Sequence, residues 1–166
     1  MSEKAYILLG SNMGDREHIL DKACCMIAIS CGDIIMKSAI YESEPWGFTS
    51  EQWFLNQVIL VDVACSAHEL MECLLSIESL LGRERTSKNG YSSRPIDLDV
   101  LYFWDAIIND DFITVPHPRL HLRRFTLLPL CDIAPDFLNP VFNKSNSQLL
   151  AECDDKYIVK QYKSIK

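Results

Sequence analysis

The pattern of apolar and polar residues along the chain predicts four β-strands. Each predicted strand is a short run that is rich in β-branched and aromatic residues and bounded by turn-forming residues. The four runs are residues 6–9, 34–41, 54–64 and 96–104. In the last run, alternation would place Leu101 and Phe103 on the face opposite Leu98, so the second half of this strand would be buried on both faces.

Two segments between these strands have the apolar periodicity of amphipathic helices. Asp15 can cap the first helix, and the Gly32–Asp33 pair would end it. The second helix begins with a capping box formed by Ser66 and Glu69, and Gly82 is its expected end. Both helices therefore have recognisable start and stop residues.

The C-terminal part of the chain is predicted to add smaller elements. A helix is expected from Leu120 to Ile133, where Pro129 should end or kink it. From Val141 onward the pattern is weaker and indicates a short helix near Gln148 and a peripheral strand near Tyr157. We interpret this segment as an addition to the main domain.

The order of these elements predicts an α+β fold. Strand, helix, strand, strand, helix, strand is the order of the ferredoxin-like βαββαβ core, in which helices pack on a mostly antiparallel sheet. The chain has 166 residues, which suits one domain with a substantial core. We therefore predict a single domain over residues 1–166, with C-terminal additions.

Charge and cysteine usage narrow the possible environments and partners. The net charge is −7, from 16 basic and 23 acidic residues, which argues against nucleic acid or anionic membranes as partners. No apolar run is long enough to span a membrane, and the run near the N-terminus is too short for a signal peptide. The seven cysteines are odd in number and include no C-x-x-C motif, so we expect free thiols in a cytoplasmic protein. We also expect a monomer.

The run Arg94–Val100 carries the most informative polar residues. Asp97 and Asp99 stand two apart and would project from one face of the strand, with Cα atoms about 6.6 Å apart. Carboxylates at this spacing can bridge two hard cations, and Arg94 could bind phosphate oxygens. The alternative is the solvated face of an edge strand, but unpaired carboxylates beside apolar residues would need a cation or an arginine.

Two further groups of basic residues suit phosphate binding. Arg83 and Arg85 follow the second helix on a polar loop, residues 83–93, that could move and clamp a polyphosphate. The alternative is a solvated loop whose cations favour the end of the helix dipole. His117, fixed between two prolines, precedes a second basic group, and a single histidine is as often structural as functional.

Aromatic and amide residues suggest a site for a flat heterocycle. Trp46 and Phe54 are core aromatics in the simplest interpretation, but Asn56 begins an apolar strand, where a buried amide needs partners. No nucleophile–base motif is present, and the Gly10–Gly14 turn lacks the lysine and the spacing of a P-loop. The residues therefore favour positioning and charge stabilisation over covalent catalysis.

Seven motifs occur together in one order. They are Tyr6–Asp15, Tyr41–Gly47, Phe54–Asn56, Arg94–Asp99, Val115–Arg119, Arg123–Phe125 and Leu128–Leu130. This ordered set, which spans about Tyr6 to Pro135, resembles the 6-hydroxymethyl-7,8-dihydropterin pyrophosphokinases of folate biosynthesis. The resemblance implies transfer of pyrophosphate from ATP to the hydroxymethyl group of the dihydropterin, with AMP as the second product.

The same resemblance implies roles for individual residues. It assigns two Mg²⁺ ions to Asp97 and Asp99, and gives the wider catalytic set as Arg83, Arg85, Arg94, Asp97 and Asp99. The residues that match the ATP site are Glu78, Arg83, Arg94, Thr114, His117 and Arg123. The residues that match the pterin site are Ser43, Pro45, Trp46, Phe54, Asn56, Tyr91 and Phe125.

Some positions depart from the family pattern, and two other functions fit parts of the sequence. Tyr91-Ser92-Ser93 replaces the usual Trp-Gly-Pro, and Leu122 replaces a polar residue. A ferredoxin-like regulatory module would bind a small ligand without turnover. A two-metal phosphodiesterase would use the same aspartates without a pterin. The arginine-rich loops and the aromatic residues favour the pyrophosphokinase.

Overall fold

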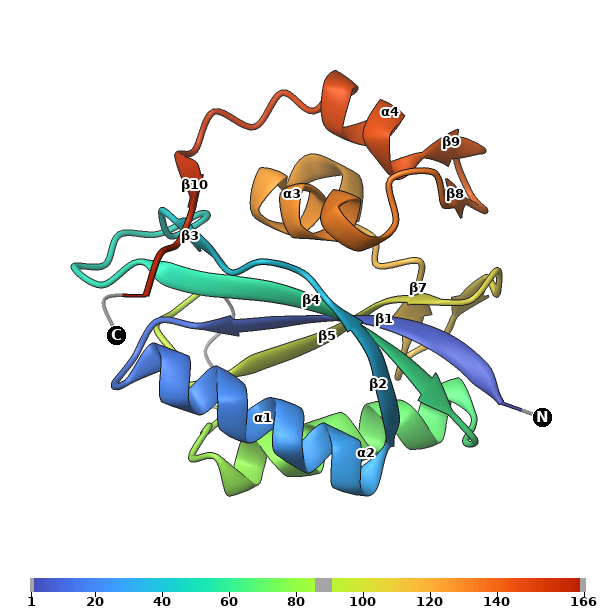
Figure 1. The fold of residues 1–166 in the computed structure, drawn as a ribbon, viewed down its shortest axis with the longest axis horizontal. Coiled ribbons are helices and arrows are strands. Elements are labelled where there is room, and N and C mark those ends of the chain that lie inside the picture. The colour runs from blue at the N-terminus through green and yellow to red at the C-terminus, as the bar shows by residue number, and fades with distance from the viewer. Residues whose placement is uncertain (1, 86–90, 165–166) are drawn as a thin grey trace.

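A six-stranded antiparallel sheet lies at the centre of the computed structural model, which describes residues 2–85 and 91–164 (Figure 1). Its strands are β1 (Glu3–Ser11), β2 (Gly32–Lys37), β3 (Tyr41–Ser43), β4 (Phe54–Val63), β5 (Asp97–Phe103) and β10 (Val159–Gln161). The order across the sheet is β10-β3-β4-β1-β5, and β2 also pairs with β4. The central strand β1 therefore lies between β4 and β5.

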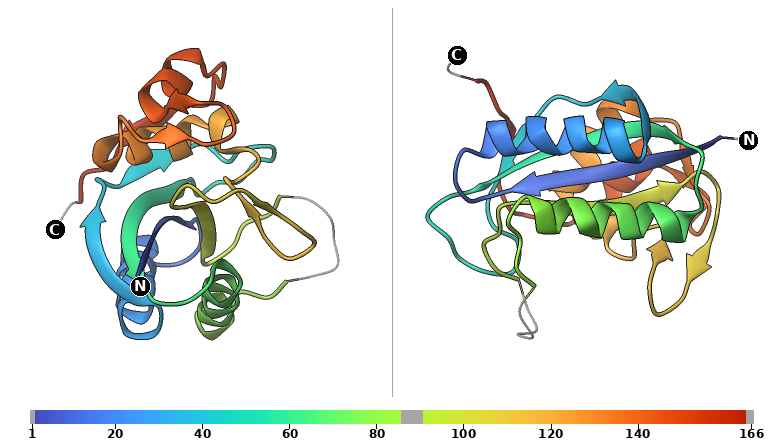
Figure 2. Two further views of the ribbon diagram at one scale, coloured as in Figure 1. Left: turned by 90° about the vertical axis from the view of Figure 1, so that its right-hand side faces the viewer. Right: turned by 90° about the horizontal axis from the view of Figure 1, so that it is seen from below.

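Helices α1 (Arg16–Ser30) and α2 (Ala67–Leu80) lie side by side on one face of the sheet, as the right-hand view of Figure 2 shows. With β2 and β3 taken as one interrupted strand, the topology is the predicted ferredoxin-like βαββαβ core. The predicted strand 34–41 is interrupted because Ser38 binds β4 partly through its side chain. Its Oγ accepts a hydrogen bond from the Val58 N–H at 2.9 Å.

The predicted ends of both helices are confirmed. The Asp15 carboxylate accepts from the His18 N–H at 3.2 Å. Ser66 Oγ accepts from the Glu69 N–H at 3.2 Å, and the Glu69 carboxylate accepts from the Ser66 N–H at 2.7 Å. Gly82 follows α2 with φ of +93°, a conformation that favours glycine. No helix in the described part of the chain is long and apolar enough to cross a membrane.

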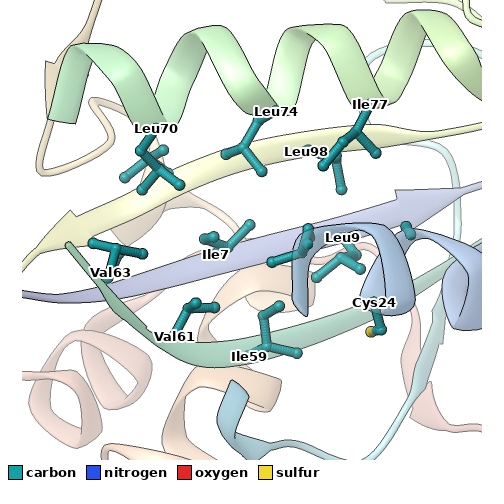
Figure 3. Packing of buried hydrophobic residues seen from close by; sticks show 14 of the residues in the cluster. Ile7, Leu9, Cys24, Ile59, Val61, Val63, Leu70, Leu74, Ile77 and Leu98 are labelled. Atoms are coloured by element: carbon teal, nitrogen blue, oxygen red, sulfur yellow. The ribbon is translucent and has the colours of Figure 1, made fainter. Parts of the chain in front are cut away.

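The larger core lies between these two helices and the sheet (Figure 3). Leu70, Leu74 and Ile77 of α2 pack toward Ile7 and Leu98 on the strands. Each fully buried aliphatic side chain of this kind contributes about 1.5–3 kcal/mol to folding. The core therefore fixes α2 against the first part of β5, where the two aspartates lie.

The opposite face of the sheet is covered by α3 (Arg124–Ile133) and α4 (Asn146–Glu152), above the sheet in Figure 1. The predicted helix 120–133 is two pieces, because a 3₁₀ turn, η1 (Leu120–Leu122), precedes α3. Of the two outcomes expected at Pro129, an end or a kink, the end is wrong, since α3 continues to Ile133. Pro129 removes one backbone donor from the helix and is itself buried.

The prediction for the second half of β5 is wrong at Phe103. Leu101 and Tyr102 both face the second core, and Phe103 packs in the core under α1 and α2. The cause is a register shift between β1 and β5, where Tyr6 pairs with Tyr102 and Ile7 pairs with Val100. Such a bulge reverses the alternation of the residues that follow it.

Several short elements escaped sequence prediction. Two hairpins of two-residue strands join the main elements: β6 (Ile108–Asn109) with β7 (Thr114–Val115), and β8 (Leu138–Asn139) with β9 (Lys144–Ser145). The predicted short helix and the late strand are present as α4 and β10. Of the predicted loop 83–93, residues 86–90 lie outside the described part of the chain.

Candidate active site

A cavity opens on the α3 side of the sheet where β1, β4 and β5 meet. Gly10 of β1 pairs with Asn56 on one side and Asp97 on the other, which sets these two side chains in one row. A Cβ at Gly10 would lie 3.6 Å from Asn56 Oδ1 and 3.7 Å from Phe54 Cδ1, so glycine leaves the floor open. The lining residues are Leu8, Gly10, Ser43, Glu44, Trp46, Phe48, Phe54, Asn56, Tyr91, Arg94, Asp97, Asp99, Arg123 and Phe125.

Asp97 and Asp99 both reach this cavity but differ in their protein partners. Asp97 Oδ1 accepts from Arg83 at 2.6 Å, and its other oxygen lies 3.5 Å from Arg94. Burial would raise the pKa of Asp97, but the charges of Arg94 and Arg83 outweigh burial and hold this pKa below its usual range. Asp97 is therefore a paired carboxylate.

The Asp99 side chain makes no hydrogen bond or ion pair with any other residue in the described part of the chain. Burial, reinforced by the charge of Asp97, raises the pKa of Asp99 to about 7, although Arg123 opposes this effect. The Asp99 carboxylate oxygens are therefore available to a ligand, and its environment favours a positive charge.

Glu78, at the end of α2, joins the loop arginines to the aspartate strand. Its side chain is 2% exposed, and its Oε2 accepts from Arg83 at 2.6 Å and from the Leu98 N–H at 2.7 Å. Its Oε1 accepts from Arg85 at 2.6 Å. Burial would lower the pKa of Arg83, but Asp97 and Glu78 raise it, so this arginine stays charged. Both carboxylate oxygens of Glu78 therefore accept hydrogen bonds from protein groups.

Asn12, which sequence reasoning did not select, fixes the position of Arg94. The Asn12 side chain is 1% exposed. Its Oδ1 accepts from the Arg94 N–H at 2.8 Å, and its Nδ2 donates to Ser93 Oγ at 3.0 Å. The Gly10–Gly14 turn could have pointed to Asn12, because a polar residue in a glycine turn at the end of a strand is well placed to bind a second loop.

Arg123 lies inside the cavity, among aromatic rings. Its guanidinium carbon is 4.7 Å from the centre of the Trp46 ring, 5.6 Å from Tyr91 and 5.4 Å from Phe125. It donates to the Tyr91 hydroxyl at 3.0 Å, while its buried Nε has no partner in the described part of the chain. The unpaired donor marks a place where a ligand acceptor would be favourable.

The opposite wall of the cavity combines an amide with aromatic faces. Asn56 is 2% exposed, and its Nδ2 donates to Ser43 Oγ at 2.8 Å and to the Tyr41 carbonyl at 3.2 Å. Phe54 meets Phe48 edge-on at 6.1 Å between ring centres, and Arg94 lies 5.5 Å over the Phe54 ring. A flat, hydrogen-bonding molecule suits such a wall.

A second cavity shares Asp99 with the first. It is lined by Met71, Asp99, Val100, Phe112, Ile113, Thr114, His117 and Pro118. His117 Nδ1 accepts from the Arg119 N–H at 3.1 Å. Burial, with the charge of Arg123, lowers the pKa of His117 to about 4, so this ring is neutral at pH 7. Two cavities therefore meet at one carboxylate.

Most of the predicted site residues come together in these cavities. Ten of the predicted residues line the first cavity: Ser43, Trp46, Phe54, Asn56, Tyr91, Arg94, Asp97, Asp99, Arg123 and Phe125. Thr114 and His117 line the second cavity. Arg83, Arg85 and Glu78 form the network beside Asp97, whereas Pro45 is buried between two lining residues. Phe48, Met71 and Phe112 line the cavities but were not predicted.

Known proteins resemble this chain in both sequence and fold. The family model described as 7,8-dihydro-6-hydroxymethylpterin-pyrophosphokinase (HPPK) matches residues 6–135. A 2-amino-4-hydroxy-6-hydroxymethyldihydropteridine pyrophosphokinase of Methylorubrum extorquens is 40% identical over 136 residues, covering 81% of this chain and 85% of that protein. One from Porphyromonas gingivalis is 37% identical over 137 residues, covering 81% and 92%.

The fold agrees with this assignment. The crystal structure of Plasmodium falciparum HPPK-DHPS superposes with a TM-score of 0.73 at 15% identity, covering 92% of this chain and 44% of that one. The family match covers the motifs that place both aspartates, the amide wall and His117. The chain belongs to the 7,8-dihydro-6-hydroxymethylpterin-pyrophosphokinase family.

Proposed function

We propose that this chain transfers pyrophosphate from ATP to the hydroxymethyl group of 6-hydroxymethyl-7,8-dihydropterin in folate biosynthesis, at the two cavities that meet at Asp99. The observation that carries this assignment is the shared position of Asp99 between an aromatic, amide-lined cavity and a second cavity beside His117. Such an arrangement allows a heterocycle and a nucleotide to approach one another across a carboxylate. It suits a transfer reaction between two bound molecules.

The carboxylates fit a pair of Mg²⁺ ions. The half-buried Asp99 carboxylate has no protein donor and no cation in contact in the described part of the chain. Mg²⁺ binds one or two carboxylates together with waters and substrate phosphates, so two aspartates are a sufficient protein contribution. When bound, these ions would neutralise phosphate charge and orient the reacting groups. We assign them to Asp97 and Asp99.

We assign the nucleotide to the second cavity and to the arginines. Thr114 and His117 would contact it there, with its phosphates extending toward Asp99, Arg83, Arg94 and Arg123. Phosphoryl transfer passes through a loose transition state whose charge spreads over phosphate oxygens. Fixed guanidinium groups stabilise that charge without reorganising, so Arg83, Arg85 and Arg94 would contribute to catalysis.

We assign the dihydropterin to the first cavity. Asn56 and Ser43 would read its polar edge, and Phe54 and Phe125 would lie on its two faces. In the structure the Arg94 and Arg123 guanidinium groups lie over those two rings. Planar cations occupy the faces that a planar heterocycle would take, so both arginines would shift toward the phosphates when the pterin binds.

We also propose that the chain acts as a cytoplasmic monomer. All seven cysteines are free thiols, as in a reducing compartment.

A single assay tests the assignment. Purified chain is mixed with ATP, Mg²⁺ and 6-hydroxymethyl-7,8-dihydropterin, and AMP is measured with each component omitted in turn. We expect AMP only in the complete mixture. Asp97→Asn and Asp99→Asn should each lower kcat by roughly 1000-fold or more, because metal-ion charge stabilisation is worth several kcal/mol.

The matched control is Asp105→Asn, which changes an exposed carboxylate just after β5. Its activity should equal that of the unaltered chain. AMP formation without Mg²⁺ would refute the metal assignment. Phosphodiester hydrolysis without pterin, or pterin binding with no AMP, would refute the transfer reaction.

A further inference from the structure

Two thiols lie in contact where α1 and α2 pack side by side on the sheet; Figure 2 shows the two helices. Cys31 follows the last residue of α1, and Cys73 lies within α2, 42 residues later. Their Sγ atoms are 2.7 Å apart. We propose that Cys31 and Cys73 are an oxidation site, which forms an intramolecular disulfide when the protein meets a two-electron oxidant such as hydrogen peroxide.

Regular structure holds both thiols in place. The Cys31 N–H donates to the Ile27 carbonyl at 2.8 Å, and the next residue, Gly32, pairs with Val63 of β4. Cys73 precedes Leu74, which is fully buried in the core beneath α2. Neither backbone needs to unfold for the sulfur atoms to meet. A disulfide needs an S–S bond of about 2.0 Å, so small side-chain rotations suffice.

The surroundings allow an oxidant to reach this pair. Cys31 and Cys73 are half-buried, whereas Cys24 is sealed in the core. Cys25 is exposed on α1 and has no thiol within hydrogen-bonding distance in the described part of the chain. Cys65 lies near the pair and is the thiol that could compete with Cys31. The positions of the thiols therefore favour a Cys31–Cys73 disulfide over one that involves Cys24, Cys25 or Cys65.

The chemistry balances with one peroxide molecule. Either thiol of the pair can react first, in its thiolate form. That thiolate attacks one peroxide oxygen, the O–O bond breaks, hydroxide leaves, and the sulfur becomes a sulfenic acid. The sulfur of the other cysteine then attacks this sulfur, the S–O bond breaks, and a second hydroxide leaves. The two thiol protons convert both hydroxides to water.

The disulfide should stabilise the fold without altering catalysis. It would close a long loop between the end of α1 and the middle of α2 and so lower the entropy of the unfolded chain. Gly32 pairs with Val63, at the opposite end of β4 from Phe54 and Asn56. Cys31 therefore lies at the opposite end of β4 from the residues assigned to the dihydropterin.

Thiol mapping tests the proposal directly. The reduced chain is treated with hydrogen peroxide, alkylated with iodoacetamide and digested for mass spectrometry. We expect two of the seven cysteines to escape alkylation, in one peptide pair that joins Cys31 to Cys73 with the loss of two hydrogen atoms. The oxidised chain should melt about 5–10 °C higher, and dithiothreitol should reverse this shift.

Matched variants make the result decisive. Cys31→Ser and Cys73→Ser should lose both the cross-link and the thermal shift while keeping the basal pyrophosphokinase activity. Cys25→Ser should keep all three. A cross-link that persists in Cys31→Ser would overturn the proposal in favour of a Cys65–Cys73 pair. Full alkylation of Cys31 and Cys73 after oxidation would overturn it altogether.

Discussion

Glu78 shows how a single buried charge can organise the residues of a site. The family resemblance places it among nucleotide-site residues, yet both its oxygens bind protein groups: Arg83 and the Leu98 N–H on one, Arg85 on the other. A buried carboxylate that binds two arginines fixes where their charges lie. We infer that Glu78 is a positioning residue that acts through the loop arginines.

This inference predicts a specific kinetic change in Glu78→Gln. The amide keeps the size of the side chain but removes the charge that pairs with Arg83 and Arg85. We expect kcat to fall about 10–100-fold with little change in the KM for ATP, since the arginines would stabilise the transition state less well. Breaking a buried ion pair should also lower the free energy of unfolding by about 3 kcal/mol in urea titrations.

Glu72→Gln is the matched control, because Glu72 lies on the same helix but is exposed. Its kinetics and stability should stay within experimental error of the unaltered chain. A rise in the KM for ATP at constant kcat in Glu78→Gln would instead indicate direct contact with the nucleotide.

The lowered pKa of His117 should make the free energy of unfolding depend on pH. This pKa is lowered from 6.5 to about 4, so between these values the unfolded chain binds a proton that the folded chain does not. The free energy of unfolding should therefore decrease as pH falls from 6.5 to 4. In His117→Asn, which keeps an acceptor for the Arg119 N–H, this decrease should be smaller.

Denaturant titrations at a series of pH values measure the effect. His18→Asn serves as control, since His18 is exposed on α1 and should leave the pH profile unchanged. Equal slopes for His117→Asn and the unaltered chain would show that another group carries the proton linkage.

At the scale of elements, the sequence predicted correctly those features that depend on interactions between residues close together in the chain. Both helices and their caps followed from residues within one turn of each end, because capping bonds join near neighbours. The break at Ser38 and the bulge at Leu101 were missed, since each depends on pairing with another strand. Alternation alone cannot reveal where a ladder slips.

The candidate site follows the same division. Asp97 and Asp99 were predicted because two residues on one strand share a face by geometry alone. Asn12 was missed because its partners, Ser93 and Arg94, lie 81 and 82 residues away. The motifs that match a known family predicted most of the remaining residues, whose proximity no local pattern shows.

The capping box of α2 gives a testable energy for one element. Ser66→Ala should lower the free energy of unfolding by about 1 kcal/mol, because it leaves the Glu69 N–H without its side-chain acceptor. Ser79→Ala changes an exposed serine at the other end of the helix and should be neutral. In a double-mutant cycle, Glu69→Gln should couple to Ser66→Ala but not to Ser79→Ala.

At the scale of the whole molecule, two cores share one sheet. The first lies under α1 and α2, and the second joins α3 and α4 to the other face. Because strands β1, β4 and β5 supply residues to both cores, we infer that the chain unfolds as one domain. The candidate site lies at the start of β5, where Asp97 and Asp99 precede the residues that enter the second core.

The C-terminal strand links the end of the chain to the candidate pterin wall. β10 pairs with β3, which ends at Ser43. The Ile158 N–H donates to the Glu44 carboxylate at 3.0 Å, across 114 residues, and the Glu44 N–H donates to the Ile158 carbonyl at 3.1 Å. Ile158 and β10 lie outside the part of the chain that matches the family model, residues 6–135, whereas Glu44 lies inside it.

If this link positions the wall, removing one backbone donor should weaken pterin binding. Ile158→Pro lacks the N–H that Glu44 accepts, whereas Ile158→Ala keeps it and trims a half-exposed side chain. We expect Ile158→Pro to raise the KM for the dihydropterin about 3–10-fold, since one charge-assisted hydrogen bond is worth roughly 1 kcal/mol or more. The KM for ATP should not change, because Thr114 and His117 lie in the other cavity. Steady-state kinetics with each substrate varied separately would measure both constants. Equal pterin KM values for the proline and alanine variants would show that the C-terminal strand does not position this wall.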